Sequence, residues 1–242
     1  MTPRITLAVA IRVLTQLRRD HRTLAMLLVL PCALMTLLWW MFDDRTFGAL
    51  GPALLALFPF IIMFLVTSVT TLRERSSGTL ERLLAMPMGK LDFLGGYAIA
   101  FGLVAAVQSV LAVALSVGVL DLGVNGPVWM LTLVAIADAV LGTALGLFVS
   151  AFARTEFQAV QFMPALVIPQ ILLCGLFVAR DAMPTVLGVI SDALPLSYAV
   201  DAMQGVARDT AISGVWGDLG IVAAFAVVVL GLGAVTLRRR SP

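Results

Sequence analysis

The sequence predicts an all-α, polytopic membrane protein with six transmembrane helices, and two observations carry this prediction. First, 61% of the 242 residues are hydrophobic and only 12% are charged, and the mean hydropathy of +1.05 is far from that of a soluble domain. Second, apolar stretches of about 20 residues or more, the length that spans a bilayer as a helix, recur along the chain. We expect the spans at residues 24–42, 46–72, 93–120, 122–153, 157–179 and 219–237.

The basic residues are divided unequally between the two ends of these spans. All but three of the 16 Lys and Arg residues lie on the side that holds both termini. The other side has Arg45, Arg180 and Arg208 against eight aspartates, which are Asp43, Asp44, Asp121, Asp181, Asp192, Asp201, Asp209 and Asp218. Because an excess of Lys and Arg marks the cytoplasmic side, we expect both termini in the cytoplasm. The large excess of Arg over Lys, with abundant Ala, Val and Gly, indicates a GC-rich bacterial genome and therefore a bacterial plasma membrane.

Three regions are expected along the chain. Residues 1–22 are predicted to form an amphipathic helix in the cytoplasmic interface, because Arg12 and Arg19 fall on one side of a helix and apolar residues lie elsewhere around it. A basic tail that sets topology and is helical by chance has the same pattern. Residues 23–237 are predicted to form the six-helix membrane domain, and residues 238–242 a basic cytoplasmic tail.

A charged segment at residues 73–90 separates the second span from the third. Leucines at i, i+3 and i+4 from Leu80 form one apolar face, which predicts a short helix across the cytoplasmic surface. Gly78 permits a tight turn before this helix, and Pro87 ends it. A short, charged, ordered element between two spans favours a docking surface for a soluble protein, although an ordinary amphipathic loop helix has the same pattern.

The residues of this segment resemble a known family. The pattern Glu74-x-x-x-Gly78-Thr79-Leu80-Glu81-Arg82-Leu83-Leu84-x-x-Pro87 resembles the signature after the second span of permeases in the type-2 ABC exporter superfamily. Residues 94–96 resemble that family's entry into its third span, and residues 194–205 resemble its extracellular segment before the last span. The resemblance covers essentially the whole chain. It departs at Tyr97, where the family commonly has Lys, and at Gln204, where it often has Arg.

The resemblance implies a permease that exports an amphipathic or lipophilic substrate, such as a drug, an antibiotic or a lipid-like molecule. It also implies a dimer, with an identical or a similar permease, and two cytoplasmic ABC ATPase subunits that bind ATP and Mg. Carried over by position, the element that contacts these ATPases would consist of Glu74, Gly78, Thr79, Glu81, Arg82 and Pro87.

The motifs of an enzyme are not found in the sequence. The phosphate-binding pattern G-x-x-x-x-G-K-[ST] does not occur, so we expect the energy to come from another polypeptide and no cofactor to be bound by this chain. The single histidine, His21, lies beside a basic cluster, and no metal site, Ser–His pair or pair of intramembrane carboxylates is recognisable. The basic residues lie within a few residues of span ends, which argues against a nucleic-acid partner.

Polar residues inside two predicted spans are candidates for the substrate path or its gate. Asp138 lies near the middle of the fourth span, where an ionised carboxylate costs at least about 2.5 kcal/mol. It shares a stripe with Gly142 and Gly146, whose small size lets a neighbouring helix approach closely. Gln161 and Gln170 accompany two prolines in the fifth span. For all of these residues, helix packing alone is an equal alternative to a role in transport.

Residues 181–212 are too many for a simple turn, yet their apolar segments are too short to span a bilayer. We expect two short re-entrant helices on the extracellular side, the second beginning near Pro195 and carrying Tyr198 and Asp201. By resemblance, these helices would cap the outer end of the substrate path. A surface amphipathic loop is the alternative.

A proton-coupled secondary carrier that uses Asp138 is the rival class of function. Such a carrier would need an inverted repeat and usually more spans, and Asp138 is the one feature that favours it. An ATPase partner is required by the permease interpretation and not by the carrier, so it distinguishes the two.

Overall fold

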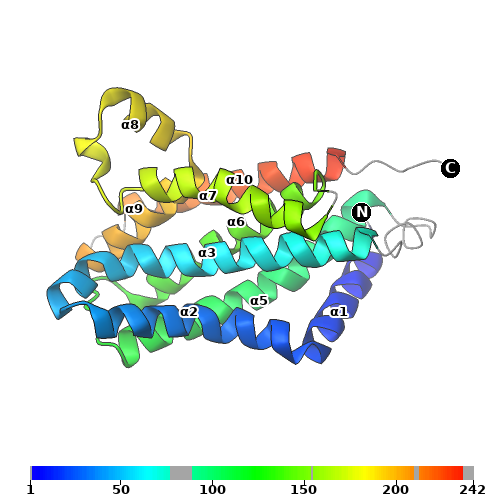
Figure 1. Cartoon of the computed structure of the whole chain (residues 1–242), viewed down its shortest axis with the longest axis horizontal. Coiled ribbons are helices and arrows are strands. Elements are labelled where there is room, and N and C mark those ends of the chain that lie inside the picture. The colour runs from blue at the N-terminus through cyan, green and yellow to red at the C-terminus, as the bar shows by residue number, and fades with distance from the viewer. Residues whose placement is uncertain (1, 77–88, 154, 210–212, 237–242) are drawn as a thin grey trace.

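The computed structural model describes residues 2–76, 89–153, 155–209 and 213–236, and within these ranges every regular element is a helix (Figure 1). Most helices run side by side along the long axis of the molecule, while α1 lies obliquely at one end and α8 projects at the other. The elements are α1 (Pro3–Arg19), α2 (His21–Met41), α3 (Asp44–Ser76), α5 (Lys90–Gly118), α6 (Val128–Ser150), α7 (Glu156–Leu173), η1 (Arg180–Ala182), α8 (Thr185–Asp192), α9 (Pro195–Arg208) and α10 (Ser213–Thr236).

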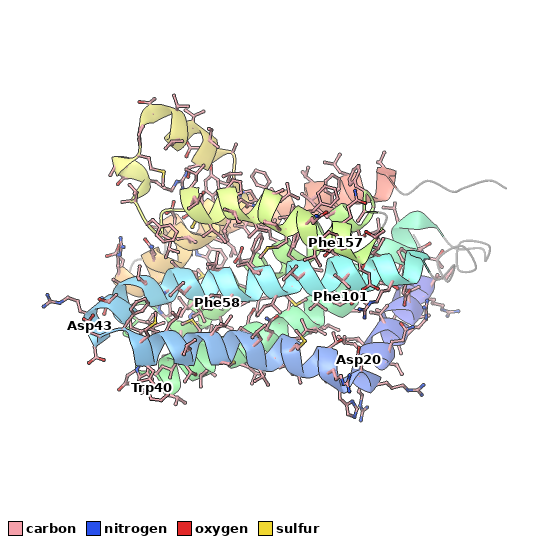
Figure 2. The ribbon with its side chains drawn as sticks, viewed as in Figure 1. Asp20, Trp40, Asp43, Phe58, Phe101 and Phe157 are labelled. Carbon is pink, nitrogen blue, oxygen red and sulfur yellow. The ribbon has the colours of Figure 1, made fainter. Side chains whose placement is uncertain are left out.

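Six of the described helices are long and apolar enough to cross a membrane, which confirms the predicted class and number of spans. They are α2, α3, α5, α6, α7 and α10. The two ends of the bundle differ in charge. We call the end that holds α1, the end of α3 and the starts of α5 and α7 the basic end, and the opposite end the acidic end. In Figure 2, α2 runs from Asp20 at the basic end to Trp40 at the acidic end, where Asp43 follows.

The fourth and fifth spans are shorter than the sequence suggested. The fourth was predicted over residues 122–153, but α6 begins at Val128, because Asp121 has a positive φ of 52° and Pro127 occupies the position before the helix. The fifth was predicted to continue to residue 179, but α7 ends at Leu173, because Gly175 adopts a φ of 89° that no helix continues through. Hydropathy alone does not register either turn.

The corner between α1 and α2 consists of a single residue, Asp20. Its carboxylate accepts hydrogen bonds from the Thr23 backbone N–H at 3.1 Å and from the Thr23 hydroxyl at 2.6 Å, so it caps the first turn of α2. These two hydrogen bonds hold the pKa of Asp20 below its ordinary value. The cap is therefore ionised at neutral pH, and it weakens only when acidic pH protonates the carboxylate.

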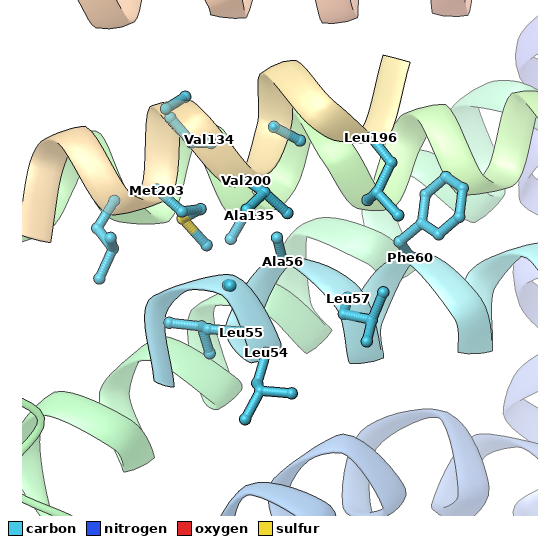
Figure 3. Close-up of a cluster of buried hydrophobic side chains, with 14 of the residues drawn as sticks. Leu54, Leu55, Ala56, Leu57, Phe60, Val134, Ala135, Leu196, Val200 and Met203 are labelled. Carbon is cyan, nitrogen blue, oxygen red and sulfur yellow. The ribbon is translucent and has the colours of Figure 1, made fainter. Parts of the chain in front are cut away.

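The centre of the bundle is the contact between α3 and α6. A methyl group added at Gly146 would lie 2.6 Å from the backbone oxygen of Phe64, and one added at Gly142 would collide with the backbone oxygen of Phe60. The two backbones therefore touch without intervening side chains, as the small-residue stripe on α6 predicted. Next to this contact, α9 adds Leu196, Val200 and Met203 to the buried cluster drawn in Figure 3.

Two short helices precede the last span, as expected. α8 and α9 meet at an angle of 91°, and each is too short to cross a bilayer by itself. Leu196, Val200 and Met203 bury one face of α9 against the bundle, whereas Val186 and Val189 of α8 are exposed. The pair thus has one arm packed inside the protein and one arm outside it.

We predict that Gly146→Ala destabilises the protein by about 1–3 kcal/mol, because the added methyl forces the backbones of α3 and α6 apart. The measurement is the free energy of unfolding in detergent. Gly220→Ala is the matched control, since a methyl at Gly220 of α10 meets no atom of the described residues within 4 Å. Equal stability of the two variants would show that the α3–α6 contact is looser than the structure has it.

Candidate functional site

Glu74 belongs to the predicted ATPase-contacting element, and its carboxylate is turned toward the bundle. Its Oε1 accepts a hydrogen bond from Arg12 Nη2 of α1 at 3.0 Å, and its Oε2 accepts one from the Tyr97 hydroxyl of α5. The Glu74 side chain is 13% exposed. The remaining residues of that element lie outside the described residues, namely Gly78, Thr79, Glu81, Arg82 and Pro87. Direct contact of this element with an ATPase stays a prediction.

The neighbouring residue Arg73 points to a different helix. Its Nε and Nη2 donate to the two carboxylate oxygens of Glu156, the first residue of α7, at 2.7 and 3.0 Å. Both side chains are largely exposed, so the pair adds little to stability. Its two parallel hydrogen bonds nevertheless fix the direction of the contact. Arg73 and Glu74 therefore connect the end of α3 to α7 on one side and to α1 and α5 on the other.

Asp138 is fully buried in α6, and neither of its carboxyl oxygens has a hydrogen-bond partner among the described residues. Gln108 of α5 is likewise fully buried with its side-chain oxygen and nitrogen unpartnered in the same part of the chain. An ionised carboxylate that is buried without hydrogen bonds costs much free energy, so we expect Asp138 to carry a proton. Its role in transport or in helix packing stays a prediction.

The two glutamines of α7 do not lie together. Gln170 is buried, where its Nε2 donates to the Leu166 carbonyl at 3.1 Å and its Oε1 accepts from the Leu196 N–H of α9 at 3.4 Å. Gln161 is exposed. The structure thus gives Gln170 a place at the junction of α7 with α9, and leaves Gln161 on the uncovered face of α7.

The predicted outer segment surrounds a polar cavity of about 420 Å³ at the acidic end. Arg180 lines this cavity. One of its guanidinium nitrogens pairs with Asp201 of α9 and another pairs with Asp192 of α8, while the guanidinium carbon lies 4.9 Å from the centre of the Tyr198 ring. Tyr198 in turn donates to the Asp192 carbonyl at 2.8 Å. α9 begins at Pro195, in the first helical turn.

Sequence reasoning singled out Tyr198 and Asp201 but missed Arg180. The available signal was that Arg180 is one of three arginines among eight aspartates on this side, which makes an ion pair with one of those aspartates a natural expectation. The structure shows that Arg180 ties both arms of the α8–α9 pair to the chain that follows α7.

Comparison with known proteins identifies the class that this architecture represents. Residues 5–207 match the family model described as ABC-2 type transporter. The chain therefore belongs to the ABC-2 type transporter family, which confirms the resemblance inferred from its motifs.

Individual relatives are distant. The chain is 25% identical over 169 residues to the probable multidrug ABC transporter permease YbhR of Escherichia coli, and this match covers 69% of the chain and 46% of the relative. It is 27% identical over 147 residues to the inner membrane transport permease YhhJ of the same species, and this match covers 60% of the chain and 39% of the relative. It is also 23% identical over 164 residues to ABC transporter G family member 20 of Dictyostelium discoideum, and this match covers 68% of the chain and 22% of the relative. The matched region is thus less than half the length of each relative.

We predict that Asp138→Asn leaves the melting temperature of the protein unchanged or raises it. Asparagine has the shape of the protonated carboxyl group and avoids the cost of a buried charge. The measurement is thermal unfolding of the purified protein in detergent, with transport assayed in parallel. A large drop in melting temperature would show that an ionised Asp138 has a stabilising partner. Unchanged stability with lost transport would assign Asp138 to the transport cycle rather than to helix packing.

Proposed function

We propose that the chain is the membrane-spanning permease subunit of an ATP-driven exporter, and that separate ABC ATPase subunits hydrolyse the ATP. Membership of the ABC-2 type transporter family is the observation that carries this proposal. The name of one relative supports it, since YbhR of Escherichia coli is described as a probable multidrug ABC transporter permease. The missing phosphate-binding motif also supports an energy source outside this chain.

The distribution of charge supports an orientation for the complex. The basic end, with both termini, faces the cytoplasm of a bacterial cell. Two ABC ATPase subunits, each with bound Mg and ATP, dock at this end against residues 78–87. Closure of the ATPase pair on ATP moves this segment, and the helices tilt between states that open inward and outward. Substrate leaves at the acidic end, beside the α8–α9 pair.

The uncovered face of α7 supports a dimer. Phe157, Gln161, Pro164, Ile168 and Leu172 recur along this exposed stripe at helical spacing. Proline at positions 164 and 169 leaves backbone carbonyls one turn earlier without their helical partner. Free carbonyls and a glutamine amide are expensive in lipid and acceptable against protein or a water-filled path. A second copy of this chain, or a similar permease, therefore covers this face.

A path between two such faces would suit an amphipathic or lipophilic substrate better than a small ion. Its lining would be mostly apolar, with an amide from each copy, which fits a drug, an antibiotic or a lipid-like molecule. The proton-coupled carrier remains the alternative function, because such a carrier would use a fully buried Asp138 that has no hydrogen-bond partner among the described residues.

We predict that the chain co-purifies with the ABC ATPase whose reading frame adjoins its own, and that the complex hydrolyses ATP in liposomes. Gly78→Pro and Glu81→Arg are expected to lose assembly or ATPase activity, because they distort the docking segment or reverse its charge. Arg45→Glu, which also reverses a charge but lies at the acidic end, is the control. The permease proposal fails if no ATPase associates, or if the two variants behave like the wild type.

We predict that Gln161→Cys forms a cross-link between two copies in membranes treated with a short bifunctional maleimide. Native Cys32 and Cys174 are first replaced by alanine, so that one thiol remains on each copy. Val227→Cys is the matched control, since Val227 is also exposed, at 68%, but lies on a different span, α10. Dimer formation at position 227 and not at 161 would place the partner on α10 instead. Because a similar permease could replace the second copy, the experiment includes any permease encoded beside this chain.

A further inference from the structure

We propose that Asp138 is a proton-binding site that exchanges its proton with the acidic end of the bundle and is closed to the basic end. The route for the proton runs along the junction where α7 ends and α9 begins. That the acidic end is the outer one rests on the proposed function, whereas the site and its route do not. In that orientation, the acidity outside the cell sets the charge at the centre of the permease.

The Asp138 carboxyl group has the surroundings of a group that holds a proton. It is fully buried near the middle of α6, and neither of its oxygens has a hydrogen-bond partner among the described residues. The described residues of α3, α5, α9 and α10 place no charged side chain against it, and the titratable group that interacts with it is the Cys174 thiol. In this part of the chain no cation holds the carboxylate ionised, so a proton is the ligand that its surroundings favour.

On the basic side of Asp138, α6 is packed directly on the backbone of α3. Gly142 and Gly146 follow Asp138 at intervals of four residues. A methyl group added at the first would collide with a backbone oxygen of α3, and one added at the second would lie 2.6 Å from another. The hydroxyl of Thr143 is used within α6 itself, and the buried hydroxyl of Thr71 lies beyond the glycine contact. Backbones that touch leave no room for a polar relay, so this contact closes Asp138 to the basic end.

On the acidic side, buried polar groups gather where α7 ends and α9 begins. The Ser191 hydroxyl donates to the Leu173 carbonyl at 2.7 Å and lies 3.0 Å from the Ser197 hydroxyl. The side chain of Gln170 and the thiol of Cys174 are buried in the same region. Hydroxyl, thiol and amide groups can exchange hydrogen bonds with a passing proton, whereas aliphatic side chains cannot. The junction therefore offers a polar route through an otherwise apolar bundle.

Cys174 connects this junction to Asp138 in one direction and to the polar cavity in the other. Its thiol lies within electrostatic range of the carboxyl groups of both Asp138 and Asp201. The next residue, Gly175, ends α7 with its φ of 89° and lines the cavity together with Asp201. The cavity thus reaches the last turn of α7, directly beside Cys174. A continuous set of polar groups leads from the acidic end to the buried carboxyl group.

Access from one end distinguishes this site from that of a proton-coupled carrier. A carrier takes up its proton on one side of the membrane and releases it on the other, so both ends must reach its site in turn. Asp138 takes its proton from the acidic end and returns it there, which leaves a carboxylate at the centre of the bundle. No proton crosses the membrane in this exchange. The site therefore responds to pH on one side, beside the fixed contact of α3 with α6.

The test follows the carbonyl stretching band of the protonated carboxyl group by infrared spectroscopy, on the purified chain in phospholipid vesicles without an ATPase. The Asp138 band is the one that disappears in Asp138→Asn, and its shift after transfer to D₂O gives the rate of proton exchange. We expect the band at neutral pH. We expect its exchange to slow by about tenfold in Ser191→Ala with Ser197→Ala, because the route loses two hydroxyl groups.

Thr71→Ala is the matched control, since it removes a buried hydroxyl on the basic side of the glycine contact. Its exchange rate is expected to equal that of the unaltered chain. Melting temperatures are measured on the same samples. Should the double serine variant unfold, Cys174→Val takes its place, because it removes the thiol at little change in volume and is expected to slow the exchange as well.

Three results would overturn the inference. If no band disappears in Asp138→Asn, the carboxyl group holds no proton and the site is refuted. If the band exchanges at an unchanged rate in the serine and cysteine variants, the route is refuted. If Thr71→Ala slows the exchange as much as they do, both ends reach Asp138, and the carrier is favoured instead. Assembly with an ATPase plays no part in these measurements, so the permease proposal stands or fails independently of them.

Discussion

The close contact between the backbones of α3 and α6 is the constraint on which the rest of the structure depends. In a membrane, lipid tails are as apolar as leucine, so burial of apolar side chains drives helices together far less than it does in water. Close packing has to replace that force, and it requires side chains small enough for backbones to touch. Gly142 and Gly146 meet this requirement against Phe60 and Phe64. The resulting pair forms the fixed core against which α5, α9 and α10 are placed.

Polar groups are arranged differently at the two ends of the bundle and at its centre. At the ends they join different helices: Glu74 contacts α1 and α5, Arg73 contacts α7, and Arg180 contacts α8 and α9. At the centre, Asp138 and Gln108 are buried without partners among the described residues. An ion pair near water breaks at moderate cost, because water then solvates both charges. A polar group at the centre of the membrane has no water to replace a lost partner. Rearrangement of this protein is therefore easiest at its ends.

The uncovered face of α7 and the weakly buried α2 give the molecule two surfaces with different requirements. α7 carries Gln161 and two prolines, which favour protein or water beside it. α2 presents apolar side chains such as Met26 and Leu37, which lipid satisfies. In the proposed dimer, the α7 faces would meet and enclose the substrate path, and α2 would lie at the lipid boundary.

The amino-acid sequence by itself determined the class, the six spans, their expected orientation, the short helices before the last span and the family. These follow from hydropathy, from the positions of Arg and Asp, and from a contiguous motif, all of which are local in sequence. Local patterns also placed Gly142 and Gly146 on one stripe of α6. They did not show where the fourth span begins and where the fifth ends, because the turns at Asp121 and Gly175 depend on backbone angles that hydropathy does not encode.

The tertiary structure decided which polar residues meet. Glu74 lies 62 positions from Arg12 and 23 from Tyr97, and Arg180 lies 21 from Asp201, so each contact depends on how the spans are arranged. The sequence marked Tyr97 as a departure from the family and Asp201 as a site candidate, but their partners were invisible in it. A pattern along the chain reports which face of a helix is apolar, whereas the identity of a neighbour across the bundle is set only when the helices pack.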